Sequence, residues 1–184
     1  EAGIAKGSVY QYFQNKLDLY RHLIDVAAER KLDYLRRHAV EIVGTFFERF
    51  RAIVFRSLQF NLENPLLSHV LYLAAREAPT SEIAEVTAKI HSDSHAFIRE
   101  MLQAATDELQ DDLDTDLASY LLSEMSIRLE DYLEQRFDFS YSVVLAAGRP
   151  SLPIPQSELE GVADSFIAIM RSGLARNSGE RRSA

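Results

Sequence analysis

Residues 1–16 read EAGIAKGSVYQYFQNK, and this stretch guides the interpretation of the whole chain. Its pattern predicts a tight turn, a very short helix over residues 6–13, and a second helix that opens at Asn15. The short helix has only Val9 and Phe13 as apolar anchors, and its other side chains are small or polar. A core helix would not be so polar. A helix that lies in a DNA groove, by contrast, needs donors for base edges and hydroxyls for phosphates.

The segment resembles the recognition helix of the tetracycline-repressor-like (TetR-type) transcriptional regulators. In that family a Gly-apolar-x-Lys-Gly-small-apolar-Tyr-x-Tyr-Phe run precedes a Lys at the start of the next helix. The resemblance implies DNA-backbone contacts from Tyr10, Tyr12 and Lys16. It implies base-edge contacts in the major groove from Lys6, Gly7, Ser8 and Gln11. The alternative is a helical hairpin that exposes polar residues by chance.

One position departs from the family pattern. Ala5 stands where these regulators commonly have a Ser, and an Ala N-cap weakens a helix start by about 1 kcal/mol. The chain also opens inside the motif, without a Met. We therefore expect the first helix and most of the second helix of such a DNA-binding domain to precede residue 1.

The composition suits one well-buried domain plus part of a second. The 184 residues are 47% hydrophobic and include no Cys, which excludes disulfides, zinc–thiolate sites and cysteine nucleophiles. No apolar run approaches a membrane-spanning length. The sequence predicts a soluble cytoplasmic protein with no membrane partner and no cofactor.

The charge is distributed unevenly along the chain. The formal net charge is −8, but residues 1–37 hold seven basic and five acidic side chains, and the remainder holds 13 basic and 23 acidic ones. Because charges beyond roughly 8–10 Å are screened at physiological salt, only the local field matters to DNA. A mildly basic head on an acidic body fits a protein that touches DNA at one end.

The rest of the chain reads as all-α. Asn15 is expected to cap the first long helix, with Asp18 three residues on as in a capping box. The segment 138–156 holds three prolines and cannot be one continuous helix. Apolar periodicity and breakers predict helices over residues 15–37, 40–62, 65–77, 81–109, 115–137 and 157–175.

Three parts follow from this organisation. Residues 1–37 form the C-terminal part of a helix-turn-helix domain with its connecting helix, residues 38–176 form a helical effector-binding and dimerisation domain, and residues 177–184 form a disordered tail.

A group of aromatic and polar side chains comes from helices that, by the resemblance, enclose an effector pocket. Packing alone explains each of them singly, but together they favour a mostly apolar cavity for a small apolar or amphipathic effector. The candidate ligand-binding residues are Phe46, Phe50, Tyr72, Arg76, His91, His95, Phe97 and Tyr120.

Two of these residues raise the alternative of a metal site. His91 and His95 stand four apart on one helix and could share an ion, but such a site needs a third ligand. We favour polar lining of the cavity or ordinary histidines at the edge of the core, and predict no metal.

Two helices are candidates for dimerisation. The helix 115–137 is apolar on nearly every side, which predicts burial against its own domain and against a partner. The last helix has a cleaner apolar seam. The candidate interface residues are Leu122, Met125, Leu129, Leu159, Val162, Phe166 and Met170.

The resemblance implies a homodimer that binds a near-palindromic operator, represses transcription and releases DNA when an effector binds. No catalytic triad, nucleotide loop or carboxylate pair stands out, so we predict that the protein is not an enzyme. The alternative is a helical small-molecule carrier or helix-bundle enzyme without DNA function.

Overall fold

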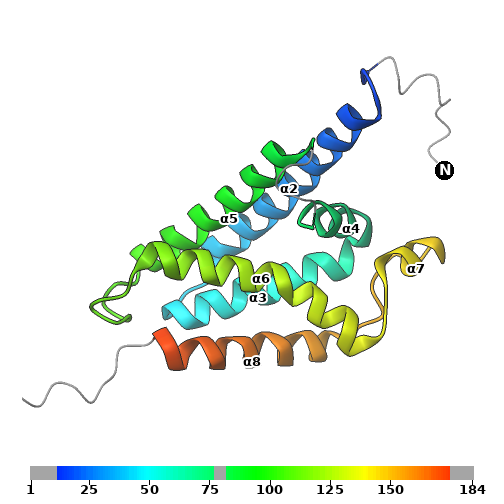
Figure 1. Ribbon diagram of the computed structural model, residues 1–184. Coiled ribbons are helices and arrows are strands. Elements are labelled where there is room, and N and C mark those ends of the chain that lie inside the picture. Colours follow the sequence, from blue (N-terminus) through cyan, green and yellow to red (C-terminus); the bar gives the residue numbers. More distant parts are fainter. Residues whose placement is uncertain (1–11, 77–81, 175–184) are drawn as a thin grey trace, which may run out of the picture.

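The computed structural model describes residues 12–76 and 82–174 of the chain. These residues form seven helices and contain no strand, which confirms the predicted all-α class (Figure 1). The helices are α2 (Lys16–Glu41), α3 (Phe46–Glu63), α4 (Pro65–Ala74), α5 (Ala84–Gln103), α6 (Thr115–Phe137), α7 (Tyr141–Ala146) and α8 (Gln156–Leu174). None of the described helices is long and apolar enough to cross a membrane.

The start of α2 lies where the sequence predicts it. The Asn15 side chain accepts a hydrogen bond from the Asp18 N–H at 2.9 Å, as an N-cap does. The Asp18 carboxylate accepts from the N–H of Gln14 at 3.0 Å, one residue earlier than in a capping box. The helix continues to Glu41, four residues beyond its predicted end at Arg37, because no breaker intervenes.

The start of α3 was predicted at residue 40 and lies at Phe46. Gly44 has a φ of +134°, where a Cβ would lie 2.6 Å from an oxygen of Glu48, so the chain turns sharply before the helix. Thr45 and Glu48 then form a capping box, in which the Glu48 carboxylate accepts from the Thr45 N–H at 2.8 Å. That bond, followed by the one from the Thr45 hydroxyl, holds the pKa of Glu48 below its usual value.

Other helix ends also differ from the sequence-based expectation. Helix α4 ends at Ala74, and α5 covers residues 84–103 in place of the predicted 81–109. The proline-rich segment 138–156 is not one continuous helix, as predicted. It contains the short helix α7, which the sequence analysis did not identify. Leu152 in this segment is buried, and its N–H donates to the carbonyl of Leu62 at the end of α3.

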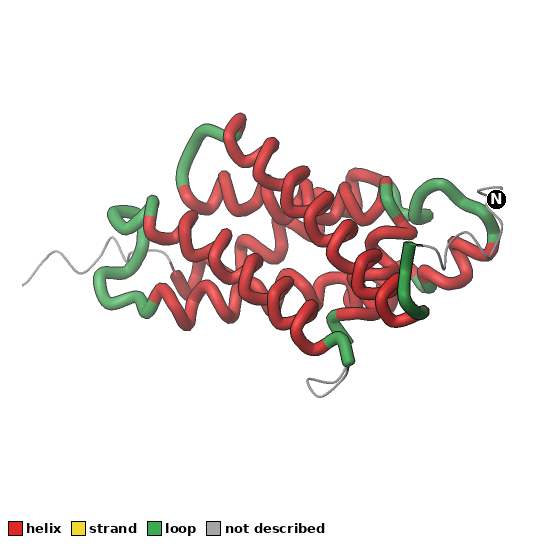
Figure 2. The backbone as a smooth tube through the Cα atoms, turned by 90° about the horizontal axis from the view of Figure 1, so that it is seen from above, coloured by secondary structure: helices red, strands yellow, loops and turns green. Residues whose placement is uncertain are grey.

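The main core forms around α3, which packs against α8 on one side. Phe46 and Phe50 stack with ring centroids 5.6 Å apart, and Phe50 meets Phe166 of α8 at 6.2 Å. A smaller cluster joins Ile24 of α2 to α4 and to Ile83. Most helices run along one long axis, and the connecting loops gather at the two ends (Figure 2). In this arrangement α2 leads from the packed body to the exposed N-terminal end of the described chain.

Candidate functional site

Two of the seven predicted DNA-contact residues, Tyr12 and Lys16, lie at the N-terminal end of α2. Tyr12 is 81% exposed, and Lys16 is the exposed first residue of the helix. Between them Phe13 is half-buried, and its ring packs against His22 at 5.4 Å. The other five predicted contact residues lie outside the described residues: Lys6, Gly7, Ser8, Tyr10 and Gln11.

Lys16 occupies an electrostatically unfavourable place for a cation. The first turn of a helix carries the positive end of the macrodipole and unsatisfied N–H groups. An approaching phosphate would relieve the conflict and accept from those groups. The exposed start of α2 is therefore suited to an anion, and its contact with DNA stays a prediction.

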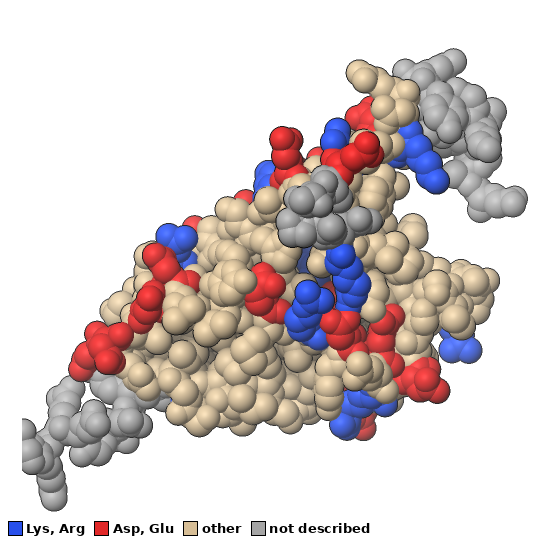
Figure 3. Space-filling view, in the orientation of Figure 1, with Lys and Arg blue, Asp and Glu red and all other residues tan. Residues whose placement is uncertain are grey.

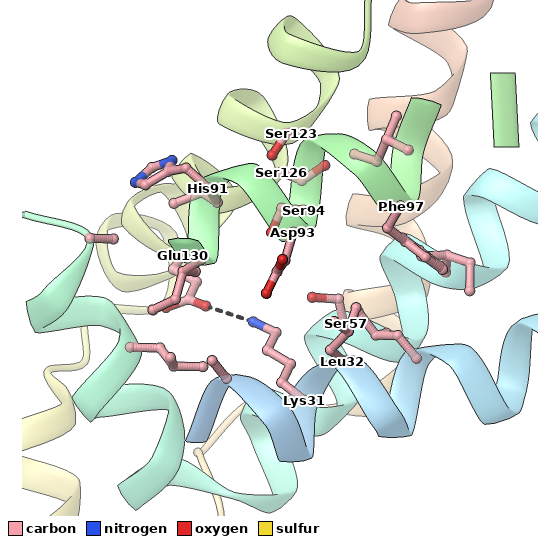
Figure 4. Close-up of a pocket in the computed structure, with 18 of the residues that line it drawn as sticks. Lys31, Leu32, Ser57, His91, Asp93, Ser94, Phe97, Ser123, Ser126 and Glu130 are labelled. Atoms are coloured by element: carbon pink, nitrogen blue, oxygen red, sulfur yellow. Dashed lines mark hydrogen bonds and ion pairs between the residues drawn. The ribbon is translucent and has the colours of Figure 1, made fainter. Parts of the chain in front are cut away.

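A cavity of about 350 Å³ lies between α2, α3, α4, α5 and α6 (Figure 4). Its wall is mostly apolar. Five of the eight predicted ligand-binding residues line it, namely Phe50, Tyr72, Arg76, His91 and Phe97. Their role in binding an effector stays a prediction.

The other three predicted residues do not line the cavity. Phe46 is fully buried in the core, against Phe47 and Phe50. His95 and Tyr120 pack edge to face at 5.2 Å where α5 meets α6. Helical periodicity marked these residues as apolar-facing but did not distinguish the cavity wall from the surrounding core.

A polar network at the cavity wall was not found by the sequence analysis. Lys31 Nζ lies 2.9 Å from Asn61 Oδ1 and 3.3 Å from Glu130 Oε1 (Figure 4). Asn61 donates to Glu130 at 2.6 Å, and Ser68 donates to Asn61 at 3.0 Å. Asn61, Ser68 and Glu130 are buried, so the network ties α2, α3, α4 and α6 together inside the protein. An Asn within a Phe-rich helix was the available signal.

A second polar group limits what Arg76 can do. Its guanidinium lies over the Tyr72 ring, 3.2 Å from the centroid, and forms an ion pair with Asp131. The Tyr72 hydroxyl donates to the Glu134 carboxylate. Burial, and then this bond, raise the pKa of Tyr72. Arg76 is therefore already paired with protein groups, although the sequence analysis offered it as a contact for an effector.

Comparison with known proteins settles the fold family. No family model and no curated protein matches the sequence. A solved structure of a TetR family transcriptional regulator from Chloroflexus aurantiacus matches 96% of this chain and 81% of its own, with a TM-score of 0.72 and 29% identity. The chain has the TetR-type fold.

Two further structures share this fold. One is the ketosteroid transcriptional regulator KstR2 of Mycobacterium tuberculosis, with a TM-score of 0.59, 18% identity, and coverage of 96% of this chain and 81% of its own. The other is a protein of unknown function from Rhodococcus sp. RHA1, with a TM-score of 0.59, 20% identity, and coverage of 95% and 81%. These two likenesses extend the shared fold to a second regulator and to a protein of unknown function.

The predicted interface residues of this TetR-type chain divide into two groups. Leu122, Leu159, Val162 and Phe166 are buried in the subunit's own core, and Leu129 and Met170 pack half-buried against it. Met125 is 40% exposed. The apolar seam of α8 therefore holds the subunit together. The apolar surface left open on α6 is Leu117, Tyr120, Leu121, Met125 and Tyr132.

Breaking the ion pair at the cavity wall tests the network. Lys31→Met leaves the buried Glu130 carboxylate without its cation and should lower the free energy of unfolding by about 1–3 kcal/mol. Adding Glu130→Gln removes the charge and keeps an acceptor for Asn61, so the double variant should recover most of the loss. Urea unfolding followed by circular dichroism measures both changes. A double variant no more stable than Lys31→Met alone would contradict the assignment.

Proposed function

We propose that this TetR-type chain is a ligand-responsive repressor that binds a near-palindromic DNA operator as a homodimer. The observation that carries the proposal is the motif over residues 6–16, which ends at the exposed start of α2. The residue types of that motif match a major-groove helix, and Tyr12 and Lys16 stand open for phosphate contacts.

Helix α2 supplies a route from the cavity to the DNA end. It carries Lys16 at its first position and Lys31 at the cavity wall, along a single helix of 26 residues. Such a helix is about 39 Å long and transmits a tilt along its whole length. A ligand that displaced Lys31 from Glu130 would shift α2 and change the spacing of two DNA-contacting ends in a dimer.

The cavity favours an amphipathic effector over a purely apolar one. Apolar side chains supply most of the wall, which suits a ring system or an acyl chain. Ser123 on α6 also lines the cavity, and its hydroxyl is buried without a hydrogen-bond partner among the described residues. A buried hydroxyl of this kind needs a partner. A polar group on the effector would satisfy it.

The outer surfaces of α6 and α8 support the dimer. Leu117, Leu121, Met125 and Tyr132 are exposed at spacings of four, four and seven, which places them along one side of α6. On α8 the exposed positions include Gly161, where an added Cβ would meet open space. Figure 3 shows few charged side chains over α8 and the adjoining lower edge of α6. Small residues allow close helix approach, and an exposed apolar stripe marks an interaction surface.

DNA binding by the full-length protein is the principal test. Lys16→Ala should weaken binding to all sequences alike and reduce the salt slope by about one per subunit. Gln11→Ala should relax preference at one base position per half-site by about 1–3 kcal/mol. Fluorescence anisotropy with DNA from upstream of the gene measures both effects, and Arg149→Ala, exposed in the loop after α7, is the matched control. If neither Lys16→Ala nor Gln11→Ala differs from the control, the proposal of DNA binding is wrong. The alternative of a small-molecule carrier would then be favoured.

The effector cavity can be tested before its ligand is known. The amphipathic dye 1-anilinonaphthalene-8-sulfonate should bind the wild type and lose most of its affinity in Ser94→Phe, because Ser94 lines the cavity and the ring would fill part of it. Ser142→Phe adds the same ring at an exposed position of α7 and should bind as the wild type does. Equal fluorescence titrations for the two variants would count against a binding cavity.

Dimerisation through α6 predicts a change in sedimentation. Leu121→Glu and Met125→Glu place charges on the exposed stripe and should yield folded monomers, because neither side chain is part of the subunit's core. Leu66→Glu, at an exposed apolar position of α4, should leave the dimer intact. A wild type that sediments as a monomer at micromolar concentration would overturn the dimer.

A further inference from the structure

Two histidines and a carboxylate converge where α5 packs against α6. His91 Nδ1 lies 2.8 Å from Glu124 Oε1, and His95 Nε2 lies 3.6 Å from the same oxygen. All three ligand atoms lie within 4.8 Å of one another. The third ligand that the sequence could not supply for the two histidines therefore comes from the neighbouring helix.

The bonding at this cluster is incomplete as it stands. A hydrogen bond to Glu124 satisfies Nδ1 of His91. His95 Nε2 is buried and has no hydrogen-bond partner within the described part of the chain, since 3.6 Å is too long for such a bond. A buried ring nitrogen that points at a carboxylate without reaching it calls for something between them.

The spacing suits a small cation held by all three groups. A zinc ion takes imidazole nitrogen and carboxylate oxygen at about 2.0–2.2 Å, so tetrahedral ligands lie roughly 3.3 Å from one another. His95 and Glu124 are close to that separation already, and His91 would have to withdraw from Glu124 by about half an ångström. The two histidine nitrogens lie within 4.8 Å of each other and would have to approach by at most about 1.5 Å, a shift that side-chain rotation can supply.

The surroundings of the cluster fit an ion that exchanges with solvent. The three side chains are between 22% and 29% exposed, which shields the ligands but leaves an entry path. In Figure 4 the His91 ring lies at the edge of the cavity, turned away from the Lys31–Glu130 pair. Asp93, between the two histidines in sequence, is paired with Lys89 at 2.8 Å and stands outside the cluster.

We propose that His91, His95 and Glu124 bind one divalent transition-metal ion, for which Zn²⁺ is the probe. The nitrogen ligands favour such an ion over Mg²⁺ or Ca²⁺, which prefer oxygen. Three protein ligands leave one tetrahedral position for water or a ligand. The ion would cross-link α5 to α6 beside the cavity, and this site does not depend on the repressor proposal.

Metal binding by the tag-free protein at pH 7 tests the site. Isothermal titration should give one Zn²⁺ per chain for the wild type, with no competition from excess Mg²⁺. His95→Ala and Glu124→Gln should each weaken binding by more than about tenfold. The matched controls are His22→Ala, an exposed histidine on α2, and Asp93→Asn, a carboxylate on α5 outside the cluster, and both should bind as the wild type does.

A second readout separates lost ligands from lost structure. Zn²⁺ should raise the thermal unfolding midpoint of the wild type and of both controls but not of His95→Ala or Glu124→Gln, whose metal-free circular dichroism shows whether they fold. Should Glu124→Gln fail to fold, Glu124→Asp takes its place, because it keeps a carboxylate. Its Zn²⁺ affinity is then compared with that of His95→Ala. The site is refuted if the wild type binds no Zn²⁺, or if the cluster variants bind it as tightly as the controls.

Discussion

A carboxylate inside the protein constrains how the helices of this TetR-type body can pack. Glu130 is buried on α6. Its charge is tolerated in the interior only because Lys31 of α2 forms an ion pair with it and Asn61 of α3 donates a hydrogen bond to it. A buried charge without such partners is strongly unfavourable. Three helices are therefore held in one register by groups that tolerate little displacement, and the cavity beside them takes its shape from that register.

The same constraint explains why the cavity has two kinds of wall. Apolar side chains from α3 and α5 can slide past one another at small cost, because dispersion contacts are not directional. The polar network cannot slide, since hydrogen bonds weaken steeply with angle and distance. The apolar side of the cavity could thus adapt to a ligand, and on the polar side a ligand would compete with the Lys31–Glu130 pair that holds α2 in place.

The sequence predicts the all-α class, the helix start at Asn15 and the approximate position of six helices, because these depend on local periodicity and caps. It misplaces the start of α3, where the signal was the Gly44–Thr45 pair and its capping partner. It cannot show that Lys31 meets Glu130, which lies 99 positions away in sequence. Periodicity also identifies the apolar face of α8 without revealing whether that face covers a core or a partner. The buried side chain of Phe166 packs in the subunit's own core.

Helix α6 presents different surfaces to the cavity, to α5 and to the exterior. Ser123 lines the cavity, Glu124 meets the two histidines of α5, and Met125 is exposed, so three consecutive residues serve three environments. Rotating or rebuilding this helix to accept a new ligand would disturb the other two surfaces at once. Changes to the cavity would propagate less from an apolar lining position such as Leu71 of α4, which belongs neither to the histidine cluster nor to the exposed stripe of α6.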